Sequence, residues 1–159
     1  MKSQNRKITA DTLRELPKSK VNDLFEALGP RKVEELKHDW NFWARDNQLA
    51  PEGDDWNTWF INAGRGFGKT RSGVEWVREQ VKVGVKRIAA VASTNSDIER
   101  VMVKGESGFL SVCWKGDKTY AGKKMGFPEW SPTKRTLTWE NGAQVQFFSA
   151  EEPERLRGP

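Results

Sequence analysis

The stretch of sequence that decides the fold is Ala63-Gly64-Arg65-Gly66-Phe67-Gly68-Lys69-Thr70. Residues 56–62 before it are mostly apolar and predict a short strand, whereas residues 71–77 after it predict a helix. A strand, a glycine-rich turn and a helix that opens on Lys-Thr together form the context of a phosphate-binding P-loop. The alternative is a glycine-rich loop with an incidental lysine.

The glycines explain how such a loop could bind phosphate. Glycine adopts positive φ at little cost, so Gly64, Gly66 and Gly68 can shape a concave turn whose N–H groups point at phosphate oxygens. The N-terminal end of the following helix adds a positive field. Lys69 would reach the β- and γ-phosphates of ATP, and the Thr70 hydroxyl would ligate Mg²⁺.

One position departs from the common motif, which begins with glycine where this chain has Ala63. Alanine tolerates positive φ poorly, so we expect the glycines that follow it to shape the turn. The dinucleotide fingerprint G-x-G-x-x-G is excluded, because after Gly64 and Gly66 its third glycine would fall on Lys69.

The composition suits one domain with a modest excess of positive charge. The chain has 159 residues, with 27 Lys and Arg against 22 Asp and Glu and a formal net charge of +5, which is compatible with a polyanionic partner. Because Cys113 is the only cysteine and His38 the only histidine, an intrachain disulfide, a His-based metal cluster and a Ser-His-Asp triad are excluded. A single cysteine favours a reducing compartment, and no apolar run approaches the ~20 residues of a membrane span.

Helices are expected before the loop. After a polar, weakly helical start over residues 1–20, apolar side chains share one helical face in residues 21–28 and again in residues 31–47. Gly29-Pro30 separates the two segments as a helix stop. These helices could cover the rest of the domain or dock a partner.

The sequence after the loop predicts a parallel βαβ unit. A helix with its apolar residues on one side ends near Gly84, and residues 86–93 form a compact apolar run typical of a buried strand. A further helix is expected over residues 98–104. Together with the strand at 56–62, this order implies a right-handed crossover.

A hairpin is predicted near the end of the chain. The strand-like segments 136–140 and 143–148 flank Asn141-Gly142, which supplies the positive φ angles of a two-residue turn. The sheet should therefore be mixed.

Residues 108–126 are less regular and combine aromatic residues with Lys115, Lys118, Lys123 and Lys124. Such a pattern can bind a nucleic-acid backbone. A solvated loop is the simpler interpretation.

Two further features bear on a nucleotide. Gln48, with Arg45 beside it, could read the adenine edge because an amide both donates and accepts, although a solvated glutamine is equally compatible.

Residues 147–152 superficially resemble a Walker B segment, an apolar strand that ends in Mg²⁺-binding acids. We discount this interpretation, because the segment has no aspartate and its strand belongs to the hairpin. Walker B is then expected beyond residue 159.

Taken together, these residues resemble the N-terminal ATPase portion of tailed-phage terminase large subunits, the motors that package DNA. The resemblance runs from about residue 38 to the end of the chain, and the Ala63 variant of the loop is normal in that family. It rests on Phe42-Trp43-Ala44-Arg45 with Gln48, on Trp56 and Trp59 before the loop, on the loop itself, on residues 73–77, on Gly105-Glu106-Ser107-Gly108 and on residues 148–159.

The resemblance implies ATP and Mg²⁺ as cofactors. It gives catalytic roles to Lys69, to Arg65 as a phosphate sensor, and to Arg157 as a finger that reaches the neighbouring subunit's γ-phosphate, with Arg155 as the second choice. A structural arginine in a surface loop is the alternative for Arg157. The expected nucleotide contacts are Gly64, Arg65, Gly66, Phe67, Gly68, Lys69, Thr70, Arg71 and Gln48, with Thr70 also the metal ligand.

The implied fold is an α/β P-loop NTPase of the RecA-like, additional-strand type, with a mixed, mostly parallel sheet, a β-hairpin and N-terminal helices. Residues 1–37 would form a helical extension. Residues 38–159 would form the first part of an ATPase domain that is incomplete, because Walker B and a nuclease domain would follow.

The implied function is to couple ATP hydrolysis to the packaging of double-stranded DNA into procapsids, in the host cell cytoplasm. The motor would be a ring of identical subunits that contacts the small terminase subunit and the portal protein, and this chain alone would hydrolyse ATP poorly. The alternatives are a helicase-like DNA-dependent ATPase of another lineage and a non-catalytic assembly fragment that docks through residues 1–47.

Overall fold

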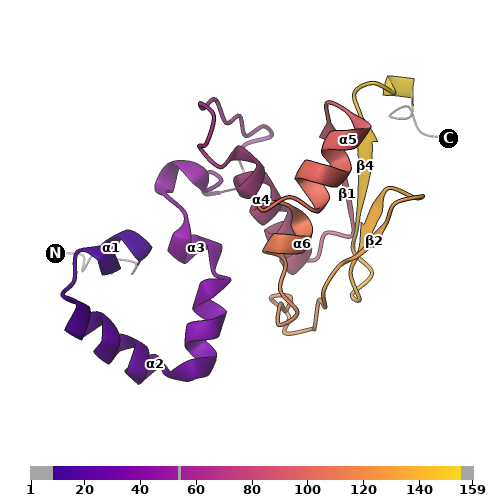
Figure 1. The fold of residues 1–159 in the computed structure, drawn as a ribbon. Coiled ribbons are helices and arrows are strands. Elements are labelled where there is room, and N and C mark those ends of the chain that lie inside the picture. The colour runs from indigo at the N-terminus through magenta and orange to yellow at the C-terminus, as the bar shows by residue number, and fades with distance from the viewer. Residues whose placement is uncertain (1–8, 54, 155–159) are drawn as a thin grey trace. The chain divides into compact units, whose positions relative to one another are not determined.

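The computed structural model describes residues 9–53 and 55–154 (Figure 1). The chain divides into two compact units, the first ending at Asn57 and the second beginning at Thr58. The first unit is helical, and the second combines helices with a four-stranded sheet. Within the described ranges, no helix has both the length and the apolar character needed to traverse a lipid bilayer.

The first unit consists of short helices around one long, interrupted helix. Its elements are α1 (Ala10–Arg14), α2 (Lys18–Lys37), α3 (Trp40–Trp43) and the 3-10 turn η1 (Asp46–Gln48). Gly29 interrupts α2 with φ 73° and ψ 162°, and the helix resumes at Pro30, which is tolerated because it starts a new first turn. The predicted continuous helix over residues 31–47 is wrong beyond Lys37, because the Asp39 side chain caps a separate helix.

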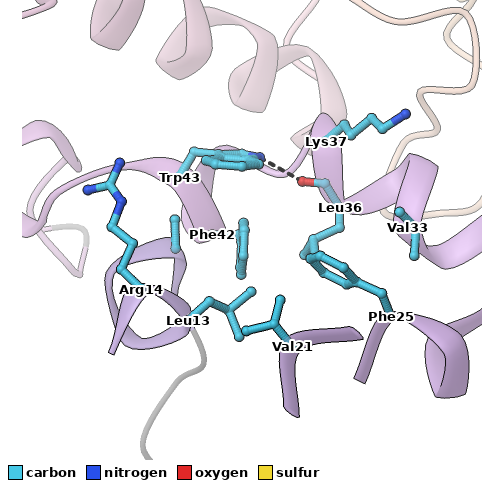
Figure 2. Close-up of a pocket in the computed structure, with 10 residues that line it drawn as sticks. Leu13, Arg14, Val21, Phe25, Val33, Leu36, Lys37, Phe42 and Trp43 are labelled. Carbon is cyan, nitrogen blue, oxygen red and sulfur yellow. Dashed lines mark hydrogen bonds between the residues drawn. The ribbon is translucent and has the colours of Figure 1, made fainter. Parts of the chain in front are cut away.

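A small apolar core holds the first unit together. Its buried members are Ala10, Leu13 and Phe42, with Leu24, Phe25 and Leu36 packed against them. Beside this core lies an apolar pocket of about 420 Å³, shown in Figure 2. Trp43 lines the pocket, and its orientation is fixed because its indole Nε1 donates to the Leu36 carbonyl oxygen (2.9 Å).

The second unit is built on a mixed sheet. Its elements are α4 (Lys69–Val83), β1 (Arg87–Ala92), α5 (Asn95–Asp97), the π-helix η2 (Ile98–Val103), α6 (Phe109–Val112), β2 (Glu129–Ser131), β3 (Thr136–Thr138) and β4 (Gln144–Ser149). The strand order is β1-β4-β3-β2. The β1–β4 pair is parallel, whereas β4–β3 and β3–β2 are antiparallel. The mixed sheet is confirmed, but the expectation of a mostly parallel sheet is wrong for the described residues.

The strand predicted at residues 56–62 is not formed; these residues have irregular backbone. A strand needs a neighbouring backbone to bond to, and apolar composition alone does not supply one; the Phe60 side chain is 81% exposed. The predicted crossover from this segment to β1 is therefore wrong as well, and the parallel partner of β1 is β4 instead. The prediction that β1 is buried is also wrong, since Ala90 is its only buried residue.

The helices that follow the loop agree better with the predictions than the strands do. α4 ends at Val83, and Gly84 adopts the left-handed conformation (φ 117°) that closes it. Its apolar face, with Val74, Val77 and Val81, is buried in the core of the unit. The helix expected over residues 98–104 is present, but it is wound as a π-helix.

The hairpin between β3 and β4 is confirmed, but its turn differs from the prediction. The Gly142 N–H donates to the Trp139 carbonyl and the Trp139 N–H donates to the Ala143 carbonyl, both at 2.9 Å, so the loop consists of residues 140–142. Only Gly142 has positive φ there (83°). Asn141 instead accepts a hydrogen bond on Oδ1 from the Ala143 N–H (3.0 Å), an Asx turn that replaces the expected left-handed asparagine.

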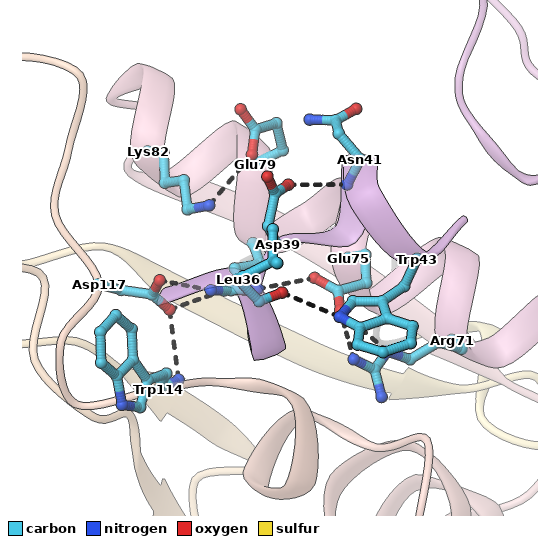
Figure 3. Close-up of polar contacts among 11 residues, drawn as sticks. Leu36, Asp39, Asn41, Trp43, Arg71, Glu75, Glu79, Lys82, Trp114 and Asp117 are labelled. Atoms are coloured by element: carbon cyan, nitrogen blue, oxygen red, sulfur yellow. Dashed lines mark hydrogen bonds and ion pairs between the residues drawn. The ribbon is translucent and has the colours of Figure 1, made fainter. Parts of the chain in front are cut away.

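A buried ionic network joins α4 to the segment between α6 and β2 (Figure 3). Arg78 donates from Nε and Nη2 to the two carboxylate oxygens of Asp117 at 2.6 and 2.5 Å, and from Nη1 to Glu75 at 3.0 Å. All three side chains are at most 5% exposed. Burial would lower the pKa of Arg78, but the hydrogen bonds and charges of Asp117 and Glu75 raise it above its ordinary value, so the guanidinium stays charged.

Replacing Arg78 with methionine should lower the free energy of unfolding by about 3–5 kcal/mol, because Asp117 and Glu75 would lose their shared buried cation. Urea denaturation measures the change. Arg31→Met is the matched control: the Arg31 side chain is 84% exposed and pairs only at the surface with Glu35, so about 0.5 kcal/mol or less is expected. Equal losses in the two variants would contradict a stabilising role for the network.

Cys113 is part of the hydrophobic core of the second unit, so its reactivity tests whether that core is closed. Burial raises the pKa of its thiol to about 12, and the side chain is buried. Between about pH 9 and about pH 12 the Cys113 thiol of the folded protein keeps its proton, whereas the thiol of the unfolded chain has lost it. The free energy of unfolding is therefore unaffected by this titration below about pH 9 and falls as the pH rises toward 12. At pH 8, Cys113 should react with a chromogenic disulfide at least about a hundredfold more slowly in native than in urea-unfolded protein. Comparable rates would show that the core is open.

Candidate nucleotide-binding site

The glycine-rich loop forms a tight turn directly before α4. Gly66 and Gly68 have positive φ, 80° and 95°, and α4 begins at the next residue, Lys69. Gly68 is the N-cap and no side chain caps this end, which leaves first-turn N–H groups to face whatever binds there. The segment is thus neither extended nor part of a continuous helix, and α4, with 15 residues, is long enough to have a macrodipole.

The Lys69 side chain folds back over this turn. Its Nζ donates to the carbonyl oxygens of Ala63 at 2.7 Å and Gly64 at 2.8 Å. An ammonium group has three donors, so one is left for another acceptor. The lysine closes the loop and places a positive charge beside the N-terminus of α4.

A pocket of about 500 Å³ opens at this turn. It is lined by Arg65, Gly66, Gly68, Lys69 and Thr70 from the loop and α4, and by Arg100, Val101, Gly105, Glu106 and Ser107 from η2 and the segment after it. Three of these side chains are cationic and one is acidic. The excess of positive charge, with the positive end of a helix, suits a polyanion such as a nucleotide phosphate chain.

Arg100 and the residues after it were not predicted as site residues. Arg100 lies on η2, and π-helical turns often occur at functional sites. The two glycines Gly105 and Gly108 are a sequence signal for a close approach of the backbone. A Cβ at Gly105 would lie 2.5 Å from the Val101 carbonyl oxygen, and one at Gly108 would lie 2.7 Å from that of Met102. Glycine at both positions lets the backbone close against η2 and brings Glu106 and Ser107 to the pocket.

Three other predicted site residues, Arg71, Phe67 and Gln48, do not line this pocket. Arg71 pairs with Glu75 (Nη2 to Oε1, 2.7 Å) and is not among the residues that line the pocket. Phe67 is half-buried in the turn itself. Gln48 belongs to the first unit, is buried, and accepts hydrogen bonds on Oε1 from the Arg45 N–H (3.1 Å) and Nε (3.2 Å). Arg155 and Arg157 lie outside the described residues.

The acids of the discounted Walker B segment bond to other protein groups. Glu152 accepts from Asn95 Nδ2 (3.0 Å) and pairs with Arg135 (3.3 Å), and Glu151 accepts from Ser149 Oγ (3.3 Å). Both acids therefore have protein partners at the end of β4.

We compared the chain with models of protein families, with curated proteins and with solved structures, and none of these comparisons found a match.

The turn itself can be tested with two glycines. Gly66→Ala should destabilise the protein by about 1 kcal/mol, because alanine is strained at φ 80° even though its Cβ would meet no atom within 4 Å. Gly64→Ala is the matched control, with equal space but no positive φ, and should change stability by less than about 0.5 kcal/mol. Thermal unfolding measures both; a larger loss for Gly64→Ala would contradict the described turn.

Proposed function

We propose that this chain binds ATP and Mg²⁺ through residues 63–70, as the ATP-binding part of a terminase large subunit that couples ATP hydrolysis to the packaging of double-stranded DNA. The observation that carries the proposal is the Lys69 ammonium folded over a glycine turn at the start of α4. Backbone N–H groups, a helix N-terminus and a lysine at one pocket are the groups that P-loops use for phosphate.

Different residues of the pocket would bind different parts of a Mg²⁺-bound triphosphate. Lys69 would exchange a carbonyl partner for β- and γ-phosphate oxygens, and the planar guanidinium of Arg65 suits a two-point grip on phosphate. Arg100 lines the same pocket and adds a third positive charge. Thr70, half-buried on the first turn of α4, supplies the hydroxyl for the metal.

The donor set fits Mg²⁺ delivered with the nucleotide. Among the described residues, no group of three or more His, Cys, Asp and Glu side chains could hold a metal ion alone. Magnesium is commonly bound by one or two protein oxygens plus substrate phosphates and water, and the Thr70 hydroxyl provides one such oxygen. When bound, the ion would neutralise part of the phosphate charge.

The terminase assignment is supported by where two separate motifs lie. The glycine-rich loop and Gly105-Glu106-Ser107-Gly108 are both part of the resemblance, and residues of both line the same pocket. On this assignment we also propose four partners: double-stranded DNA, the small terminase subunit, the portal protein and identical subunits in a ring. The proposed location is the host cell cytoplasm. Arg157 is proposed as the trans finger.

Fluorescence anisotropy of a labelled ATP analogue with Mg²⁺ tests the nucleotide site. Lys69→Ala should weaken binding by about ten- to a hundredfold, because it removes a charged donor from the phosphates. Lys82→Ala is the control on the same helix, where the lysine pairs with Glu79 outside the pocket, and its affinity should match that of the unmodified protein. If Lys69→Ala binds the analogue as tightly as this control, the nucleotide site is refuted.

A further inference from the structure

We propose that the segment 115–124, here called the lysine hairpin, binds the phosphate backbone of a nucleic-acid strand, with Tyr120 as a platform for a base. The inference takes from the proposed function only the class of ligand, a nucleic acid, and goes beyond it by naming a contact surface and a stacking platform for an unpaired base. It does not depend on the nucleotide site, because it rests on different residues.

The lysine hairpin is an ordered turn. Lys118 and Lys124 pair across it as an isolated antiparallel bridge. The Thr119 N–H donates to the Lys123 carbonyl and the Gly122 N–H donates to the Thr119 carbonyl, both at 2.8 Å. Gly122 has φ 77°, the left-handed conformation that lets the turn close.

The hairpin is anchored to the core at both ends and at its tip. Asp117 is fixed by Arg78, and its carbonyl accepts from the N–H of Met125, a residue with no exposed surface. The Tyr120 N–H donates to the Lys82 carbonyl at the end of α4 (3.0 Å). Because the backbone is already ordered, binding would cost little additional conformational entropy.

Its outward surface is strongly positive. The four lysines are exposed, whereas the only acid of the segment, Asp117, is buried and neutralised by Arg78. Lys124 has an exposed partner, Glu140 (3.0 Å), and no ion pair is found for the other three within the described residues. Lys118 and Lys124 are cross-strand partners, so their side chains share one face of the hairpin. Like charges in this arrangement oppose folding, and a bound polyanion would relieve that repulsion.

Tyr120 distinguishes a nucleic acid from other polyanions. Its side chain is 71% exposed at the tip of the turn, between the lysines. An exposed aromatic ring among cations offers a stacking surface for a base while the lysines neutralise phosphates. An acidic peptide offers the lysines charge but no base to stack on the ring.

The test is anisotropy of the full chain with a labelled 20-nucleotide single strand and a 20-base-pair duplex over a series of salt concentrations, without nucleotide. The double variant Lys118→Ala/Lys123→Ala should weaken binding at least about tenfold at low salt and reduce the slope of log K against log salt by about one to two. Lys20→Ala/Lys32→Ala removes the same charge from exposed positions of the first unit and should change the affinity less than twofold.

Tyr120→Ala separates the two forms of nucleic acid. It should weaken single-strand binding about five- to a hundredfold, and Tyr120→Phe, which keeps the ring, should restore it. A loss confined to the single strand supports stacking of an unpaired base on Tyr120, whereas an equal loss on both probes, or no loss on either, overturns that role. The proposal is overturned if the two double variants behave alike, or if polyglutamate competes as well as DNA. Since no nucleotide is present, failure of ATP binding would leave this result unaffected.

Discussion

The bidentate ion pair between Arg78 and Asp117 is the interaction on which the second unit depends. It joins the buried face of α4 to the segment that carries the lysine hairpin, and Glu75 extends it to Arg71 near the first turn of the same helix. Burying these charges is costly, and only their close pairing and hydrogen bonds compensate for that cost. The helix that begins at the candidate phosphate site and the hairpin proposed to bind nucleic acid are therefore joined directly by buried ion pairs.

The elements that sequence reasoning predicted correctly are those defined by local chemistry. The apolar spacing of α4 and its closing Gly84 are local signals, and so is the Asn141-Gly142 pair that located the hairpin between β3 and β4, although the loop is one residue longer than predicted. The failures in the sheet concern partners distant in sequence. Residues 56–62 have the composition of a strand but pair with no neighbouring backbone, and the sheet has one parallel and two antiparallel strand pairs because β4 pairs with both β1 and β3. Composition cannot reveal such pairing choices.

The candidate site shows the same division. The positive φ angles of Gly66 and Gly68 directly before a helix could be predicted from the sequence, because glycine adopts them at little cost. Arg100 could not, since its place in the pocket depends on the π-helical winding of η2 and on the backbone closing at Gly105. The Arg78–Asp117 pair, 39 residues apart, likewise left no local signature.

The exposed strand β1 has a consequence for how the protein behaves at high concentration. In the described residues its only ladder partner is β4, and Val91 is 51% exposed. An apolar strand with one unpaired edge is a template on which a second molecule can add its own backbone. The charges of Lys86 and Arg87, both exposed at the start of the strand, act as gatekeepers against such growth. Their repulsion is screened by salt, so colloidal stability at this edge is greatest in dilute buffer.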